Sequence, residues 1–272
     1  MSSLLRLDVA MVERGLAPSR ERAKERILDG DVSVGQRVIR KPSYRISVED
    51  AISCEGEGLV YVGRGGVKLE KALECGGYDL KGAIALDVGA STGGFTDCLL
   101  RRGAARVFAL DVGRDQLHPS LKKDPRVVCL EGTDARDEET LRNALQGCLV
   151  DFCSIDLSFI SFTKVLPALL PFLKPDAGVT VLIKPQFEAG REALGKRGVV
   201  RDPAVHKRVL DQACAFFDGL PLHLCGLEYS PVRGGEGNIE FLALLRCGPS
   251  ENKAAFPDTA AIVATAHQAL KF

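Results

Sequence analysis

The chain has 272 residues, 46% hydrophobic and 26% charged, an ordinary composition for a globular protein with one large domain and room for a smaller one. Its 36 Lys and Arg residues balance 36 Asp and Glu residues, which excludes a uniformly basic coat for nucleic acid but permits a local basic patch. No apolar run reaches the roughly 18 residues that span a bilayer, and Arg6 and Asp8 interrupt the apolar residues of the amino terminus, so we expect no signal peptide.

The first 60 residues are short, polar elements with a local excess of positive charge. Apolar spacing predicts a helix over residues 4–16 and a second helix that begins after Ser19 and ends at Gly30, followed by short strands at 32–34, 38–39 and 51–52. Between Arg14 and Arg45, nine basic residues face four acidic ones. They form either a solvated helix face or a site for RNA phosphates. The candidate RNA-binding residues are Arg6, Arg20, Arg22, Lys24, Arg26 and, further along, Arg64.

From about residue 82, buried apolar runs alternate with helical segments. The runs predict parallel strands at 83–88, 107–112, 127–130, 150–156 and 179–184, and the helices are expected at 96–102, 138–145, 162–173 and 203–217. Strands at 222–229 and 239–245 should form an antiparallel hairpin, because the Gly- and Pro-rich connection leaves no room for a crossover helix. Five parallel strands ending in a hairpin predict an α/β fold with the doubly wound sheet of class I methyltransferases. We therefore expect four parts: a small α+β RNA-binding domain (1–60), a connector (61–81), a Rossmann-like domain (82–248) and a helical tail (249–272).

A glycine-rich loop follows the first strand of this domain. Its spacing matches neither the dinucleotide fingerprint nor the P-loop. Asp87 at the strand end would repel a pyrophosphate but suits the ammonium and sulfonium of S-adenosylmethionine. Asp111 ends the next strand, 24 residues later, where such folds place a ribose-binding carboxylate, although a simple turn residue is the alternative. The expected cofactor-binding residues are Asp87, Gly89, Ala90, Ser91, Gly93, Gly94, Phe95, Asp111, Val112 and Asp134, the last placed to meet the adenine amino group.

Four charged residues are expected at the same sheet edge. Asp156 and Lys184 end the fourth and fifth strands, Glu240 begins the antiparallel last strand, and Lys68 in the connector can fold over that edge. Such groups are costly to bury unless they are paired. The chemistry that needs them is methylation of a ribose 2′-hydroxyl, which must lose its proton during attack. A lysine can take that proton only as the neutral amine, which burial and a second lysine favour. We expect Lys184 to be the base and Lys68 the neighbouring cation, with Asp156 and Glu240 orienting them.

Enzymes that methylate other positions of nucleic acids have different sequence motifs. Exocyclic-amine methylation typically uses [DN]PP[FY], where this chain has DLSF, and pyrimidine carbon-5 methylation needs a Pro-Cys nucleophile, whereas Cys153 lies on a buried strand. Nine cysteines occur singly and without metal-ligand spacing. This pattern favours reduced thiols in a cytoplasmic protein and no metal site. Because no apolar run is long enough to span a bilayer, we also expect no membrane as the primary partner. The four histidines are far apart in sequence and are expected to be structural.

Several motifs carry a resemblance to known families. The segment RLD-x3-VERGLAPSRERAKERILDGDVSVGQ resembles the RNA-binding domain of ribosomal protein S-four over residues 4–60. With DVGASTGGFTDCLL, ALDVG-x2-QL, DLSFIS, IKPQFE, GVVRDP and GNIEF following in order, nearly the whole chain resembles the TlyA/haemolysin A family. Its catalytic half also resembles the FtsJ-like ribose methyltransferases, whose Lys-Asp-Lys-Glu tetrad falls on Lys68, Asp156, Lys184 and Glu240.

The resemblance implies a specific activity. It implies S-adenosylmethionine-dependent 2′-O-methylation of cytidines in 16S or 23S rRNA, or both, with ribosomal subunits as the partner. Two alternatives stay open: a haemolysin-like cytolysin, disfavoured by the lack of a spanning segment, and a non-catalytic RNA-binding assembly factor, disfavoured by the intact tetrad and glycine loop. The chain departs from the family pattern at Arg114-Asp115, where the family has Tyr-Gly, and at Asp134, where it has Asn.

Overall fold

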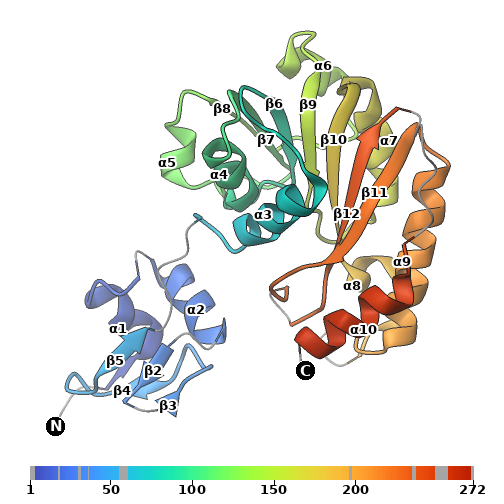
Figure 1. The fold of residues 1–272 in the computed structure, drawn as a ribbon. Helices are drawn as coiled ribbons and strands as arrows, with labels where there is room; N and C mark the ends of the chain where they lie inside the picture. Colours follow the sequence, from blue (N-terminus) through green and yellow to red (C-terminus); the bar gives the residue numbers. More distant parts are fainter. Residues whose placement is uncertain are drawn as a thin grey trace. The chain divides into compact units, whose positions relative to one another are not determined.

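A computed structural model describes residues 4–17, 19–29, 32–35, 37–54, 61–195, 198–234, 237–248 and 257–270, with only the backbone of residues 21, 22, 25 and 29. The chain divides into two compact units, Met1–Leu59 and Val60–Phe272 (Figure 1). Each unit has its own hydrophobic core and is described by itself.

Within its described residues, the smaller unit contains two helices and two small antiparallel sheets. Its helices are α1 (Leu7–Glu13) and α2 (Arg20–Asp29). One sheet pairs β1 (Leu5–Arg6) with β4 (Arg45–Ile46), and the other places β2 (Val32–Val34) between β3 (Arg37–Val38) and β5 (Ile52–Cys54). The predicted helix over 4–16 was wrong at its start, because the backbone of residues 5 and 6 pairs with β4 instead of continuing the helix. Leu7, Ala10 and Met11 line the buried face of α1 at helical spacing.

The larger unit is built on a seven-stranded sheet in the order β11-β12-β10-β9-β6-β7-β8. The strands from β10 to β8 in this order are parallel, and β12 lies antiparallel between β10 and β11. The predicted α/β fold with its antiparallel hairpin is confirmed. The strands are β6 (Ile84–Val88), β7 (Arg106–Asp111), β8 (Val127–Glu131), β9 (Val150–Ile155), β10 (Leu173–Ile183), β11 (Leu222–Tyr229) and β12 (Phe241–Cys247).

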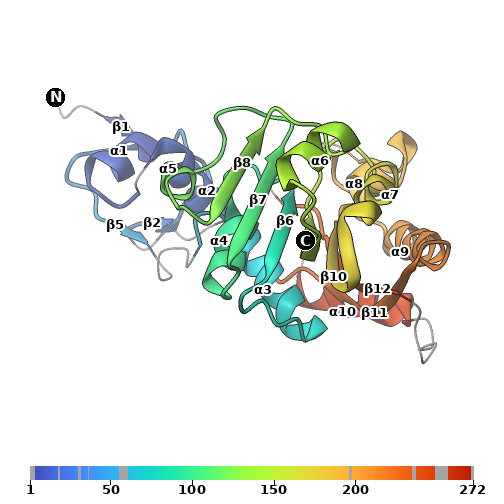
Figure 2. The same cartoon turned by 90° about the horizontal axis from the view of Figure 1, so that it is seen from above.

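Helices cover both faces of this sheet (Figure 2). On one face lie α3 (Gly65–Gly76), α4 (Gly94–Arg101) and α5 (Pro119–Lys122). On the other lie α6 (Glu138–Leu145), α7 (Leu166–Leu169), α9 (Pro203–Asp218) and α10 (Thr259–Ala269), while the short α8 (Pro185–Glu188) follows β10. The single helix predicted over 162–173 was wrong: α7 is flanked by 3₁₀ turns at 162–164 and 170–172. Pro167 and Pro171 each lack the backbone N–H that a continuous helix needs.

The interval expected as a connector contains the well-packed helix α3. Leu69, Ala72 and Leu73 are buried at helical spacing against the sheet. At its far end the Tyr78 hydroxyl donates to the Leu245 carbonyl at 2.9 Å, and the Lys71 ammonium donates to the Tyr229 carbonyl at 2.8 Å. These bonds attach α3 to β11 and β12, so residues from 61 onward are an integral part of the larger unit.

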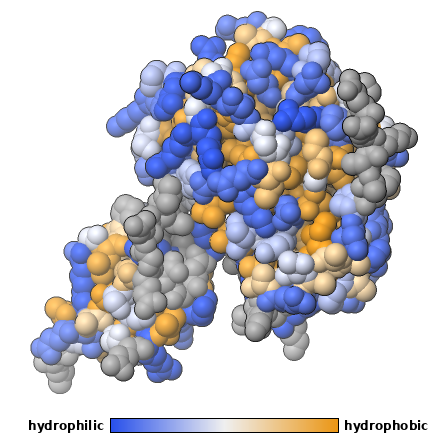
Figure 3. All heavy atoms as spheres, in the orientation of Figure 1, coloured by the Kyte–Doolittle hydropathy of each residue, from blue (hydrophilic) through white to orange (hydrophobic). Residues whose placement is uncertain are grey.

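The surface of the larger unit mixes polar and apolar residues. In Figure 3 hydrophobic residues gather in the middle of this unit, with hydrophilic residues around them. Within the described ranges, no helix combines the length and the apolar character that crossing a membrane requires.

Candidate active site

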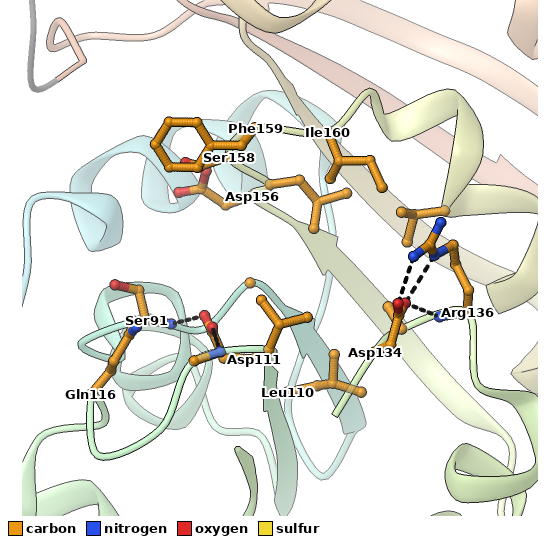
Figure 4. A pocket seen from close by; sticks show the side chains of 16 residues that line it. Ser91, Leu110, Asp111, Gln116, Asp134, Arg136, Asp156, Ser158, Phe159 and Ile160 are labelled. Atoms are coloured by element: carbon orange, nitrogen blue, oxygen red, sulfur yellow. Dashed lines mark hydrogen bonds and ion pairs between the residues drawn. The ribbon is translucent and has the colours of Figure 1, made fainter. Parts of the chain in front are cut away.

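A cavity of about 490 Å³ opens at the carboxyl edge of the parallel strands. One wall is the segment from Asp156 to Ile160 after β9, and the opposite wall carries Ser91, Asp111 and Gln116 (Figure 4). Its apolar lining includes Leu110, Val112, Ala135, Leu157, Phe159, Ile160 and Val165. The position is the one at which open α/β sheets bind small molecules, and the size lies within the usual range for such pockets.

The glycine loop shapes the inner end of this cavity. Gly89 has φ +86°, and a Cβ there would collide with the Asp156 carbonyl oxygen, so only glycine lets β6 and β9 approach so closely. The Asp111 carboxylate fastens the loop by accepting the Ser91 N–H at 2.8 Å and the Gly113 N–H at 2.7 Å. Asp111 thus reaches the cavity while holding both of its flanking loops.

The expected cofactor, S-adenosylmethionine, fits the donor set of this cavity. The Asp111 carboxylate lies at the carboxyl end of β7 and lines the cavity, where it can accept hydrogen bonds from ribose hydroxyls. Leu110, Val112 and Ala135 offer the apolar surface that an adenine ring needs, and the close backbone at Gly89 leaves space for the amino-acid part.

The structure places Asp87 away from the cavity. Its side chain is fully buried and accepts hydrogen bonds from the hydroxyls of Thr96, at 2.6 Å, and Ser154, at 3.0 Å. Burial raises the pKa of Asp87 to about 7, and the two hydroxyl bonds oppose that shift. The side chain joins α4 to β9 beneath the glycine loop, and its contact with a cationic cofactor stays a prediction.

Four other residues that are predicted to bind the cofactor lie outside the cavity lining, and their role stays a prediction. Ala90, Gly93, Gly94 and Phe95 do not line the cavity; they are packed behind it, and Phe95 lies against the start of α3 at Gly65. Gly89, Ser91, Asp111, Val112 and Asp134 do line it. Sequence spacing locates the loop but does not reveal which of its residues face inward.

Asp134 lies at one end of the cavity and is held by Arg136. The Arg136 guanidinium donates to the two Asp134 carboxylate oxygens at 3.0 and 2.6 Å. These bonds, with the Arg136 backbone N–H, lower the pKa of Asp134 to about 2. Asp134 therefore stays ionised, and Arg136, which the sequence did not single out, becomes part of the cavity wall.

The four predicted tetrad residues form two ion pairs. The Lys184 ammonium is 2.5 Å from an Asp156 carboxylate oxygen, and the Lys68 ammonium is 2.5 Å from a Glu240 oxygen. Ile183 of β10 pairs with Phe241 of β12, so Lys184 and Glu240 adjoin paired residues of neighbouring strands. Lys68, Lys184 and Glu240 are buried, and only Asp156 also lines the cavity.

The sequence analysis did not single out two residues that lie close to the tetrad. The Ser158 hydroxyl accepts a hydrogen bond from the Lys184 ammonium at 3.1 Å. Phe159, 91% exposed with φ +67°, lies with its ring centroid 5.2 Å from that of Phe187. Such a backbone conformation is uncommon for a bulky residue and is often found at functional sites. The signal was present, because both residues belong to the DLSF motif.

In the smaller unit, the candidate RNA-binding residues also make contacts within the unit. Arg6 and Arg20 both bond the buried carboxylate of Asp8, at 2.8 and 3.3 Å, and lower its pKa to about 2. Arg26 donates to the Leu16 carbonyl at 3.2 Å. Lys24 also has a partner, as does Arg64, which belongs to the larger unit. The side chain of Arg22 lies outside the described residues.

One cysteine and two histidines outside the tetrad are buried or in contact with each other. Cys153 is fully buried on β9, as expected for a core residue, and burial raises the pKa of its thiol. His206 on α9 and His267 on α10 share a hydrogen bond of 2.8 Å, a contact that sequence separation concealed. In the ranges that the structure covers, no group of three or more His, Cys, Asp or Glu residues is arranged to hold a metal.

Comparison with known proteins adds two family matches. Residues 61–247 match the model of the FtsJ-like methyltransferases, and residues 5–52 match that of the S4 domain. The chain is 42% identical to the 16S/23S rRNA (cytidine-2′-O)-methyltransferase TlyA of Mycobacterium tuberculosis, over 90% of this chain and 91% of that protein. It is 39% identical to Hemolysin A of Brachyspira hyodysenteriae, over 88% and 98%.

A solved structure is similar over the same extent. A hemolysin of Streptococcus thermophilus superimposes with a TM-score of 0.77 at 40% identity, covering 100% of this chain and 98% of that one. Sequence and structure comparisons therefore agree over both units.

Proposed function

The chain belongs to the FtsJ-like methyltransferase family, and from this premise we propose that it is an S-adenosylmethionine-dependent rRNA (cytidine-2′-O)-methyltransferase. The observation that carries the proposal is the presence of two ion pairs, Lys184–Asp156 and Lys68–Glu240, at the carboxyl edge of the sheet. They lie beside a cavity whose lining residues suit S-adenosylmethionine. We propose Lys68, Asp156, Lys184 and Glu240 as the catalytic tetrad.

The tetrad suits the removal of a proton from a ribose hydroxyl. When bound, S-adenosylmethionine supplies the methyl group. The methyl–sulfur bond would break as the methyl passes to the 2′-oxygen, and S-adenosylhomocysteine would leave. Lys184 would take the hydroxyl proton as the general base in its neutral form, so the ammonium that pairs with Asp156 would first release its own proton to solvent. Asp156 and Ser158 hold the Lys184 side chain in place through the contacts described above, and Glu240 does the same for Lys68. Fixed positions reduce the entropy that orienting the hydroxyl would otherwise cost.

The substrate class follows from the relatives and from surface chemistry. The Mycobacterium relative is named as a 16S/23S rRNA (cytidine-2′-O)-methyltransferase. The exposed ring of Phe159 stands next to Ser158 at the cavity, where it can stack on a nucleobase. The S4 unit would supply phosphate contacts from Arg6, Arg20, Lys24 and Arg26. We therefore propose that the chain modifies 16S or 23S rRNA, or both, within ribosomal subunits in the cytoplasm.

The test uses ribosomal subunits from cells that lack the modification. The subunits are incubated with the protein and methyl-labelled S-adenosylmethionine, and the rRNA is then hydrolysed in alkali. A 2′-O-methyl group blocks cleavage at its own phosphate, so the proposal predicts label in an alkali-resistant dinucleotide. Label in a mononucleotide would mean base methylation and refute the tetrad, and no label in either subunit would refute ribosomal RNA as the substrate.

A lysine variant tests the base directly. Lys184→Ala should lower methyl transfer by roughly 10²–10⁴-fold, the range for general bases, while S-adenosylhomocysteine binding is retained. Lys174→Ala is a matched control, because Lys174 pairs with Asp151 at 2.6 Å and its side chain is 43% exposed. Near-normal turnover by Lys184→Ala would show that another group takes the proton.

A further inference from the structure

The loop of residues 112–118, between β7 and α5, contributes to the cavity in two ways. Gly113 and Gln116 line the cavity directly. Behind the cavity, the His118 N–H donates to the Thr92 carbonyl at 3.1 Å. The Leu117 side chain packs into the space that a Cβ on Gly93 would occupy. The 112–118 loop therefore forms one cavity wall and also supports the glycine loop from behind.

One carboxylate holds this loop in shape. Glu131, the last residue of β8, accepts the backbone N–H groups of Asp115 at 3.1 Å, Gln116 at 2.7 Å and Leu117 at 2.7 Å. Three successive backbone N–H groups that point toward one carboxylate form the kind of concave site that binds anions. Here the anion is a side chain of the chain itself, and the Lys122 ammonium completes the set at 2.7 Å.

The loop conformation depends on this convergence. Asp115 has φ +57°, which is uncommon for a residue other than glycine, and its side chain is 98% exposed, so no packing of its own holds it there. The Glu131 side chain, by contrast, is only 13% exposed. The N–H bond from Leu117, followed by the contact with Lys122, lowers the pKa of Glu131 to about 2. Glu131 is therefore an anion throughout the neutral and mildly acidic range.

We propose that Glu131 is a positioning residue for the cofactor: it holds the 112–118 loop so that Gly113 and Gln116 face the cavity and Leu117 supports the glycine loop. This inference rests on the proposed function, since it takes S-adenosylmethionine to be the occupant. Glu131 itself does not line the cavity and acts entirely through the backbone of the loop.

The test measures binding of S-adenosylhomocysteine to the full chain by isothermal titration calorimetry. In the wild type, one Glu131 oxygen accepts hydrogen bonds from the Asp115 N–H and the Lys122 ammonium. Glu131→Gln replaces this oxygen with an NH2 group, which donates hydrogen bonds and cannot accept them. Because a hydrogen bond to a charged group is worth roughly one power of ten in affinity, Kd should rise about tenfold or more. Lys122→Ala is the matched control, since it removes the cation but leaves the three backbone bonds in place.

Hydrogen–deuterium exchange of the ligand-free protein gives a second measurement. Glu131→Gln should speed exchange of the Asp115 amide most, because that N–H loses its acceptor, and Lys122→Ala should leave this amide protected. With ribosomal subunits as substrate, KM for S-adenosylmethionine should rise with Kd while kcat stays near that of the wild type. A merely structural role would instead lower the amount of active protein and leave KM unchanged.

The outcomes separate this inference from the proposed function. Failure of the wild type to bind S-adenosylhomocysteine would overturn the proposed cofactor and, with it, the role of Glu131. If the wild type binds and Glu131→Gln binds within about twofold of it, the positioning role alone is overturned. An equal loss in Lys122→Ala would also overturn it, because the effect would then belong to the charge pair and not to the loop.

Discussion

Replacing Lys68 by methionine removes the cation of the buried ion pair with Glu240 and leaves a carboxylate without its partner. The two side chains are only 10% and 3% exposed, so water cannot replace the lost contact. Breaking such a pair by removing one partner costs about 3–5 kcal/mol. We therefore expect a loss of about 3 kcal/mol in the free energy of unfolding, at the lower end of that range.

The loss should be visible by scanning calorimetry. For a unit of this size, each 1 kcal/mol shifts Tm by roughly 2–4 °C, so the transition of the larger unit should fall by about 6–12 °C. The Lys68→Met/Glu240→Gln double variant should lose less than the sum of the two single variants, with a coupling of about 1–3 kcal/mol. Lys207→Met is the control: its pair with Asp211 is about half exposed on both sides and should be worth less than about 1 kcal/mol.

Two results would refute this reasoning. A Tm change for Lys68→Met no larger than that of Lys207→Met would show that the pair is solvated. Strictly additive losses in the double variant would show that the two charges do not interact in the folded protein.

Three further predictions concern single residues. Gly89→Ala should destabilise the larger unit more than Gly147→Ala and should weaken S-adenosylhomocysteine binding, measured by calorimetry, because both glycines have positive φ but only the Cβ at position 89 meets another atom. Burial lowers the pKa of His206 to about 4, below its ordinary 6.5, so stability should fall as the pH drops from 6.5 towards 4, and His206→Gln should flatten that dependence in pH-dependent unfolding. Burial raises the folded pKa of Asp87 from 3.8 to about 7, so the wild type should lose stability relative to Asp87→Asn as the pH rises from about 4 to about 7 and show no further relative change above that, in the same unfolding measurements.

Much of the fold could be predicted from periodicity. The β11 range (Leu222–Tyr229) and the α6 range (Glu138–Leu145) agree with the sequence-based expectation, because buried strands and amphipathic helices leave different apolar patterns. Elements with little pattern of their own were missed. β1 and β4 have two residues each and exist only because their backbones pair, and α3 is flanked by glycines that resemble a linker.

The approximate position of the site was also predictable. Parallel strands bring their carboxyl ends to one edge, so Asp111, Asp156 and Lys184 had to lie near one another once the strands were assigned. The antiparallel course of β12 brings Glu240 to the same edge, where Ile183 and Phe241 pair. Residue type and strand order were sufficient for this inference.

Local sequence patterns were sufficient to predict the classes of elements, the order of the motifs and the edge at which the charged residues meet. Tertiary structure decided which side chains face the cavity: Asp87 points to Thr96 and Ser154, whereas Ser158 and Phe159 reach the Lys184 environment. It also joined His206 to His267 and bent the backbone of residues 115–117 around Glu131. Such contacts depend on how helices and loops pack onto the sheet, and local sequence patterns carry no information about partners that distant segments supply.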